Sequence, residues 1–233
     1  SLLECSENFL RELREICTRK KIILIFDEIY TGWGKTGEFF YFMKYNNLIP
    51  DVLTMSKSFG GGKSSISCFT TTNQIFHKAY GKIQDSTIHS TTYNAFGEEA
   101  VTAIEAVNIA VEDKYPEKAK EIGNLIKTNL YDLKNKYPNQ IKEIRGTGCL
   151  QGIIFYSGPE IIKKIITLIP SELTNDERFV NKLITSSVIS ILYSEFKILT
   201  SLGQNRDICL WISPSLVVNK DDVEYFFNSL DKT

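Results

Sequence analysis

The chain has 233 residues, of which 42% are hydrophobic and 24% charged, so it can bury a core and has the composition of an ordinary globular protein. Its formal net charge is −1, from 27 basic and 28 acidic residues, which argues against nucleic acid or a membrane surface as a partner. Five scattered cysteines, none in a CxxC spacing, argue against a metal site or a disulfide framework and favour reduced thiols in a cytoplasmic protein. No apolar stretch is long enough to span a bilayer, and the first residues do not have the layout of a signal peptide.

The first half of the chain alternates between predicted helices and strands. Apolar residues at helical spacing predict a helix over 3–19. The apolar run 22–26 follows, and it is typical of a strand buried on both faces of a parallel sheet. A glycine-bearing loop over 31–37 comes next, and further strands are predicted over 51–55 and 66–69. This order of elements predicts an α/β sheet.

The second half has a different pattern, that of an α+β unit. From residue 96 onward, helices and strands are predicted over 96–111, 116–136, 141–145, 150–156, 159–168, 175–192, 208–212 and 220–230. Asn219 is expected to cap the last helix, with Asp221 and Asp222 in its first turn. We therefore expect two domains, with residues 1–113 in the first and 114–233 in the second.

Two charged residues directly follow predicted strands of the first half. They are Asp27 and Lys57. Because ligands of open α/β sheets bind at the carboxyl ends of strands, this acid and this lysine are candidates for one site. A salt bridge, or two solvated strand ends, fits the spacing equally well.

Five segments resemble motifs of class III aminotransferases. Residues 25–37 (IFDEIYTGWGKTG) resemble the family's aspartate motif. Thirty positions after that aspartate, residues 56–62 (SKSFGGG) resemble its Schiff-base lysine with the glycine triplet that follows. Residues 89–93 (HSTTY) resemble the segment that lends a threonine to the cofactor phosphate of the neighbouring subunit. Residues 144–150 (IRGTGCL) resemble the RG-G motif that opens the C-terminal domain, and 212–216 (ISPSL) stand where the family has a PPL-like stretch. In this order the motifs cover essentially the whole chain.

The resemblance implies a fold, a cofactor and an activity. The implied fold is α/β: the second half of the large mixed-sheet domain of fold type I, which binds pyridoxal phosphate, followed by a small α+β C-terminal domain. The implied cofactor is pyridoxal 5′-phosphate (PLP), and the implied enzyme is a homodimeric transaminase. It moves an amino group between a small amine or amino acid and an oxo acid or aldehyde. Two alternatives stay open: a PLP-dependent aminomutase or epimerase on the same fold, and a non-catalytic interaction domain.

The resemblance also assigns roles to individual residues. Lys57 holds the cofactor aldehyde, and Asp27 keeps the pyridine nitrogen protonated so that the ring serves as an electron sink. Ile29, on the same side of its strand as Asp27, is expected to pack against the ring face. Tyr30 stands where many members have a glutamine that contacts the ring oxygen, and its hydroxyl can still donate a hydrogen bond. The hydroxyl of Thr92 suits a phosphate oxygen.

The chain departs from the family in two further ways. It has about half the usual subunit length and starts inside the large domain, so we expect the N-terminal half of the subunit to be a partner. Whether the isolated chain is active stays open. Trp211 stands where many relatives have a carboxylate-binding arginine, and without that fork the bidentate grip on a carboxylate is lost. Trp211 is therefore a candidate substrate-binding residue that favours an amine or aldehyde without a carboxylate there, or else a core tryptophan.

Overall fold

The computed structural model describes most of the chain: residues 2–94, 96–158, 178–203, 205 and 207–233. These residues divide into two compact units. One is Cys5–Glu117, and the other combines Lys118–Thr233 with Ser1–Glu4. The domain boundary that we expect at 113–114 stays a prediction.

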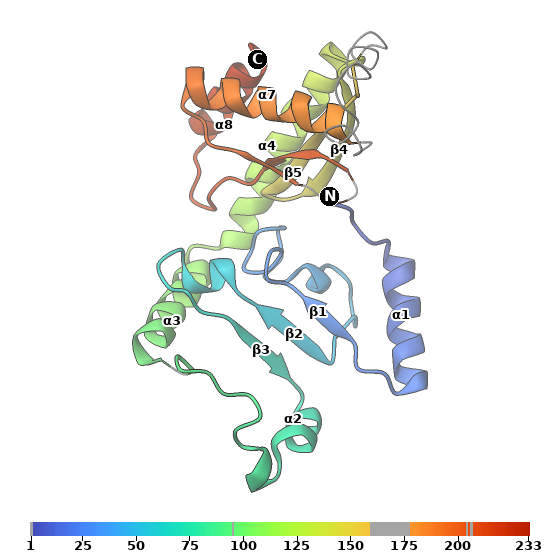
Figure 1. The fold of residues 1–233 in the computed structure, drawn as a ribbon, viewed down its shortest axis with the longest axis vertical. Helices are drawn as coiled ribbons and strands as arrows, with labels where there is room; N and C mark the ends of the chain where they lie inside the picture. The colour runs from blue at the N-terminus through green and yellow to red at the C-terminus, as the bar shows by residue number, and fades with distance from the viewer. Residues whose placement is uncertain (1, 95, 159–177, 204, 206) are drawn as a thin grey trace. The chain divides into compact units, whose positions relative to one another are not determined.

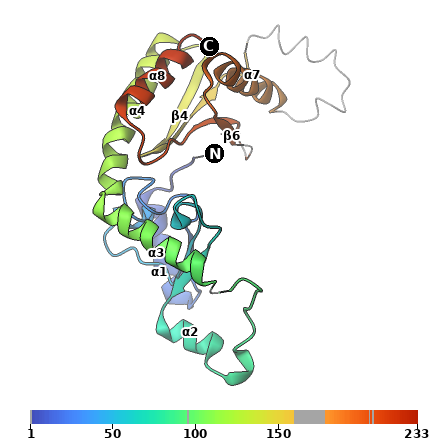
Figure 2. The same cartoon turned by 90° about the vertical axis from the view of Figure 1, so that its left-hand side faces the viewer.

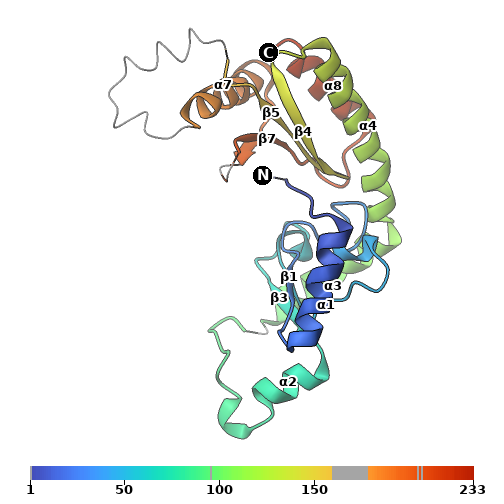
Figure 3. The same ribbon diagram turned by 90° about the vertical axis from the view of Figure 1, so that its right-hand side faces the viewer.

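The unit Cys5–Glu117 is built on a three-stranded mixed sheet. Its elements are α1 (Glu7–Lys20), β1 (Ile25–Asp27), η1 (Tyr41–Lys44), β2 (Val52–Met55), η2 (Lys57–Gly60), β3 (Cys68–Thr71), α2 (Asn73–Tyr80), η3 (Ile83–Asp85) and α3 (Gly97–Glu112). The strand order is β1-β2-β3, with β1 parallel and β3 antiparallel to the central strand (Figure 1). Helix α1 lies beside this sheet (Figures 1 and 3). This mixed sheet, with helices in the same unit, confirms the predicted α/β class.

The first strand differs from its prediction in both position and burial. Instead of covering 22–26, it begins at Ile25 and ends at Asp27. Ile22, Ile23 and Ile25 are 54%, 52% and 57% exposed, and only Leu24 is buried. The prediction of burial on both faces was wrong, because Ile22 and Ile23 precede the strand and Ile25, at its start, is exposed.

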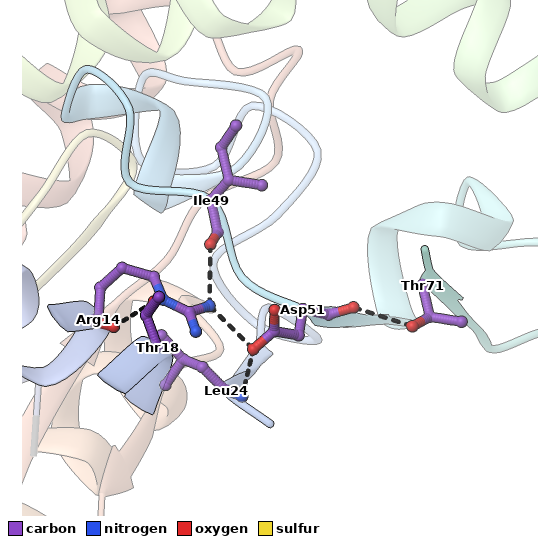
Figure 4. A network of polar contacts seen from close by, with 6 residues as sticks. All are labelled: Arg14, Thr18, Leu24, Ile49, Asp51 and Thr71. Carbon is purple, nitrogen blue, oxygen red and sulfur yellow. Dashed lines mark hydrogen bonds and ion pairs between the residues drawn. The ribbon is translucent and has the colours of Figure 1, made fainter. Parts of the chain in front are cut away.

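A polar network fixes the amino ends of the two parallel strands (Figure 4). The carboxylate oxygen Oδ2 of Asp51 accepts hydrogen bonds from the Leu24 amide at 2.7 Å and from Arg14 of α1 at 2.9 Å. Arg14 also donates to the Ile49 carbonyl at 3.3 Å, and the Thr71 hydroxyl donates to the Asp51 carbonyl at 2.9 Å. Burial alone would raise the pKa of Asp51, but the Leu24 amide and the Arg14 guanidinium hold that pKa below its usual value. The network ties α1 to the start of both strands.

The second unit is an antiparallel sheet covered by helices. Its elements are α4 (Tyr115–Lys136), which begins in the first unit, β4 (Ile141–Thr147), β5 (Leu150–Phe155), α7 (Phe179–Phe196), β6 (Ser201–Gly203), β7 (Cys209–Ile212) and α8 (Lys220–Leu230). The strand order is β4-β5-β7-β6, and β4, β5 and β7 run side by side (Figure 3). Helices α4 and α8 also lie side by side (Figure 2), and they bury apolar faces in one core with the sheet. Members of this core include Ile126, Leu130, Ile153, Leu192, Leu210 and Phe227.

Most of the predicted elements of the second unit are confirmed. Helix α8 has the predicted bounds, and the Asn219 side chain accepts the Asp222 amide at 2.8 Å, as a cap should. The helix predicted over 175–192 corresponds to α7, from Phe179 onward. The helix predicted over 159–168 lies outside the described residues. Among the helices that are described, none is both long enough and apolar enough to cross a membrane.

Candidate active site

Asp27 and Lys57 lie at the same edge of the mixed sheet. Asp27 is the last residue of β1, and Lys57 opens the turn η2 just after β2. Because β1 and β2 are adjacent and parallel, their carboxyl ends meet at this edge, and both charged side chains are exposed there. Among the described residues, no carboxylate oxygen lies within 4.0 Å of the Lys57 amine. The structure therefore does not contain the Asp27–Lys57 salt bridge that the spacing also allowed.

The Asp27 carboxylate is fixed through one oxygen and open at the other. Oδ1 accepts hydrogen bonds from the Ile29 amide at 3.1 Å and from the Thr54 hydroxyl at 3.0 Å. Thr54 is the register partner of Asp27 on β2, so the sheet itself sets this contact. Within the described part of the chain, Oδ2 accepts no hydrogen bond. In this position, Oδ2 can accept a hydrogen bond from a protonated ring nitrogen while Oδ1 keeps its two hydrogen bonds.

Lys57 has an unusual backbone conformation for a residue with a side chain. Its φ is 50°, in the left-handed region, which costs a non-glycine residue about 1–2 kcal/mol. Such a conformation persists only where the surrounding structure fixes it, and it is common at functional sites. The Lys57 amine lies 5.0 Å from the centre of the Tyr30 ring. Partial burial raises the pKa of the Tyr30 phenol, which favours the protonated hydroxyl that can donate a hydrogen bond.

The glycines after Lys57 differ in what surrounds them. Gly61 has a φ of 61°, and a Cβ placed there would lie 2.9 Å from the Cβ of Ala106 on α3. Glycine at this position therefore allows both the left-handed turn and the close approach of α3. A Cβ on Gly62 would meet nothing within 4 Å, so its space is open.

Glu28 is a structural residue beside the candidate site, and its role was not predicted from the sequence. Its side chain is buried, with 4% exposed. Oε1 accepts the Phe42 amide at 3.0 Å, and Oε2 accepts the Tyr41 amide at 3.0 Å together with the Thr31 hydroxyl. Glu28 thus joins the two ends of the loop that follows β1, because it stands at the start of the loop and binds the amides of Tyr41 and Phe42 at its end. No local pattern in the sequence indicates this role, because β1 ends at Asp27 and the contacts of Glu28 depend on how the following loop closes.

An aromatic stack joins this loop to the turn that carries Lys57. The Trp33 ring lies parallel to the Phe59 ring, with centroids 5.2 Å apart and an interplanar angle of 18°. Trp33 also meets Phe40 edge-on at 5.2 Å. Phe59 belongs to the same turn as Lys57, so the stack fixes the loop after β1 relative to the lysine.

Ile29 and Thr92 have roles that the structure does not test. Ile29 lies in the turn after β1 and is 36% exposed. The strand ends at Asp27, so the alternation from which we placed Ile29 on one side with Asp27 does not reach it, and that premise was wrong. Thr92 lies in an exposed turn before α3, and within the described residues it makes no hydrogen bond to Asp27 or Lys57. Both cofactor roles stay predictions.

Trp211 packs within the second unit. It lies in β7, pairs with Gly152 and Ser201, and is half-buried. A Cβ placed on Gly203 of β6 would come within 2.5 Å of the indole Nε1, so the indole covers the Gly203 backbone. This packing accounts for a tryptophan at this position, and the role of Trp211 toward substrate stays a prediction.

Comparisons with known proteins identify a family and related sequences. The sequence model of the family described as aminotransferase class-III matches residues 2–233. An uncharacterised aminotransferase of Schizosaccharomyces pombe is 30% identical over 156 residues, which cover 67% of this chain and 32% of that protein. The acetylornithine aminotransferase of Agrobacterium fabrum is 32% identical over 148 residues, which cover 64% of this chain and 35% of that enzyme.

Solved structures show the same fold. A transaminase from a marine Virgibacillus superposes with a TM-score of 0.81 at 22% identity, over 97% of this chain and 48% of that one. An aminotransferase of Bacillus anthracis superposes with a TM-score of 0.79 at 21% identity, over 99% of this chain and 48% of that one. The chain thus spans about a third of the curated relatives and about half of the solved ones, and its fold is the expected part of fold type I. From the match of the family model along residues 2–233, the chain belongs to the class III aminotransferase family.

Proposed function

We propose that this chain forms the C-terminal half of a PLP-dependent transaminase subunit. The enzyme moves an amino group between an amine or amino acid and an oxo acid or aldehyde. The observation that carries the proposal is the pair of exposed charged groups at the carboxyl ends of β1 and β2, a carboxylate with one open oxygen and a lysine in a strained turn. Membership of the class III family supports the same activity.

The residues of this edge fit PLP. When bound, the cofactor supplies an aldehyde for amines and a ring that withdraws electrons. Lys57 would hold the aldehyde through Nζ, and its freed Nζ would take a proton from the reacting carbon of the substrate and return it. Asp27 Oδ2 would keep the proton on the ring nitrogen, and the Tyr30 hydroxyl would donate to the ring oxygen.

The assignment of Lys57 is tested by reduction and peptide mapping. The complete subunit, loaded with PLP, is treated with borohydride, digested and analysed by mass spectrometry. We expect the label on Lys57. Lys63, exposed just beyond the glycines, is the internal control, and a label on Lys63 alone would refute the assignment.

The assignment of Asp27 is tested kinetically. Asp27→Asn removes the negative charge and keeps the shape, so the fold should persist while transaminase activity falls on the order of 100-fold or more. Full activity in Asp27→Ala would place the site elsewhere. Amino transfer to an added oxo acid in the unmodified enzyme separates a transaminase from an aminomutase or an epimerase, which need no acceptor. A complete subunit that binds no PLP at all would favour the non-catalytic alternative.

We further propose an assembly and a location. The rest of a family-length subunit completes the site, which the coverage of the relatives supports. Two such subunits form a homodimer with the cofactor near the interface, which the likeness of Thr91-Thr92 to the donated threonine supports, and most homo-oligomers have two-fold symmetry. A fully active monomer in sedimentation would refute the dimer. The five free cysteines support a cytoplasmic location, which cell fractionation tests.

The substrate proposal concerns Trp211. An indole has one N–H donor and no fork for a carboxylate, so we propose a preference, in one half-reaction, for an amine or aldehyde without a carboxylate at that position. The test compares ω-amines with α-amino acids as donors, in the parent enzyme and in Trp211→Arg. If the parent strongly prefers α-amino acids and the arginine variant gains nothing with them, Trp211 does not set specificity.

A further inference from the structure

We propose that Tyr30 is a positioning residue that acts through the face of its ring: the ring is the resting place of the Lys57 ammonium when that amine is not attached to the cofactor. The proposal rests on the proposed role of Lys57 and assigns Tyr30 a task that its hydroxyl cannot perform. It concerns the free Lys57 amine, and it rests on the contact between this amine and the Tyr30 ring.

The contact between the two side chains has the geometry of a cation–π interaction. The Lys57 Nζ lies 5.0 Å from the Tyr30 ring centre, inside the limit of about 6 Å for such contacts. Within the described part of the chain, no carboxylate oxygen lies within 4.0 Å of this amine. The aromatic face is therefore the electrostatic partner that the structure gives to this cation.

The backbone around the contact is fixed on both sides. Lys57 has a left-handed backbone, which sets the direction in which its side chain leaves the turn. The Trp33–Phe59 stack ties that turn to the loop that carries Tyr30. Tyr30 itself follows Asp27 by three positions, and the Asp27 carboxylate is anchored to Thr54 of β2. The Tyr30 ring and the Lys57 amine thus belong to a loop and a turn that the Trp33–Phe59 stack holds together.

This arrangement has a consequence for the reaction. A lysine that alternates between attached and free forms spends part of each cycle as a free amine on a long, flexible side chain. A ring face at an exposed site favours the nearby cation by about two- to fivefold, which limits where the freed amine lies. The effect requires the ring and not the hydroxyl, so phenylalanine can replace Tyr30 in this task and leucine cannot.

The test uses ring-current shifts in the complete subunit freed of cofactor. Reductive methylation with ¹³C-formaldehyde converts lysines to dimethyl-lysines, which remain cationic, and Lys57→Arg identifies the Lys57 signal. We expect the Lys57 methyl signal upfield of the exposed Lys63 signal in the parent and in Tyr30→Phe, and at the Lys63 position in Tyr30→Leu. A Lys57 signal that coincides with Lys63 in the parent, or stays upfield in Tyr30→Leu, would overturn the proposal.

A binding measurement gives an independent readout. Tyr30→Phe and Tyr30→Leu both lack the hydroxyl, so they differ only in the ring. Because the ring stabilises the free amine, Tyr30→Leu should bind PLP about two- to fivefold more tightly than Tyr30→Phe. Equal affinities would overturn the proposal, and Tyr30→Met, which also lacks both ring and hydroxyl, replaces Tyr30→Leu in both experiments if the leucine variant does not fold. If borohydride labels Lys57 but its methyl signal shows no ring-current shift, this inference alone is refuted. If the label is on another lysine, the proposed role of Lys57 is refuted as well.

Discussion

Glu28 can be changed without touching Asp27, which makes it a direct test of how the loop after β1 is held. Its carboxylate accepts two backbone amides and one hydroxyl in a buried position. Hydrogen bonds to a charged group contribute about 1.5–3 kcal/mol each, and a buried amide left without its partner costs about 1–3 kcal/mol. These contributions are not additive, so we expect Glu28→Ala to destabilise the loop by about 3–5 kcal/mol, which is less than the sum of the three hydrogen bonds.

Glu28→Gln is the sharper variant because it keeps the shape. One oxygen becomes an NH₂ group that faces a backbone N–H, so one amide loses its acceptor, at a cost of about 1–3 kcal/mol. Glu12→Gln is the matched control. Glu12 is exposed on α1, and the same change there should stay within about 0.5 kcal/mol.

Hydrogen exchange measured by mass spectrometry reads this effect locally. The peptide that contains Tyr41 and Phe42 should exchange faster in Glu28→Ala, by a factor on the order of 100 for a loss of about 3 kcal/mol. Peptides of α8 should not change. If Glu28→Gln exchanges like Glu12→Gln in the peptide of Tyr41 and Phe42, the carboxylate does not hold the loop and the reasoning fails.

Two further predictions concern the two ends of the sheet. The pKa of Asp51 is lowered in the folded protein, so its contribution to stability is present above its usual value of 3.8 and is lost as the pH falls through the lower folded value. Asp51→Asn should therefore flatten the acid limb of a stability–pH curve measured by urea unfolding, and an unchanged limb would contradict the assigned network. Gly61→Ala should destabilise the protein by about 1–3 kcal/mol more than Gly62→Ala. Both glycines have positive φ, but only the first would place a Cβ against Ala106, so equal unfolding midpoints would contradict the close approach of α3.

The sequence predicts long amphipathic helices well and short elements poorly. Helix α4 and helix α8 follow from apolar spacing and caps that are local in the sequence. Helix α2 was not predicted, although Thr72 caps it, because its eight residues give little more than two turns of periodicity. Strand β6 was not predicted either, since its three residues are too few to show an alternating pattern.

At the candidate site, the sequence nominates residues more readily than it predicts what each of them contacts. Family motifs single out Asp27 and Lys57, and the parallel pairing of their strands brings both to one edge. The roles of Glu28 and of the Trp33–Phe59 stack depend on how a loop closes, which local patterns do not encode. The left-handed backbone of Lys57 is likewise invisible in the sequence, because a lysine gives no sign of positive φ.

The exposed isoleucines at the start of the sheet affect the solubility of this chain in vitro. Ile22, Ile23 and Ile25 present more than half of their surface to solvent, beside a strand edge with unpaired backbone groups among the described residues. Apolar side chains next to an open strand edge are a template for aggregation. Wherever this surface meets water, the chain should be colloidally unstable, with light scattering that rises with concentration and falls when one of these isoleucines is replaced by lysine. Purification is therefore best carried out at low protein concentration and with the rest of the subunit present.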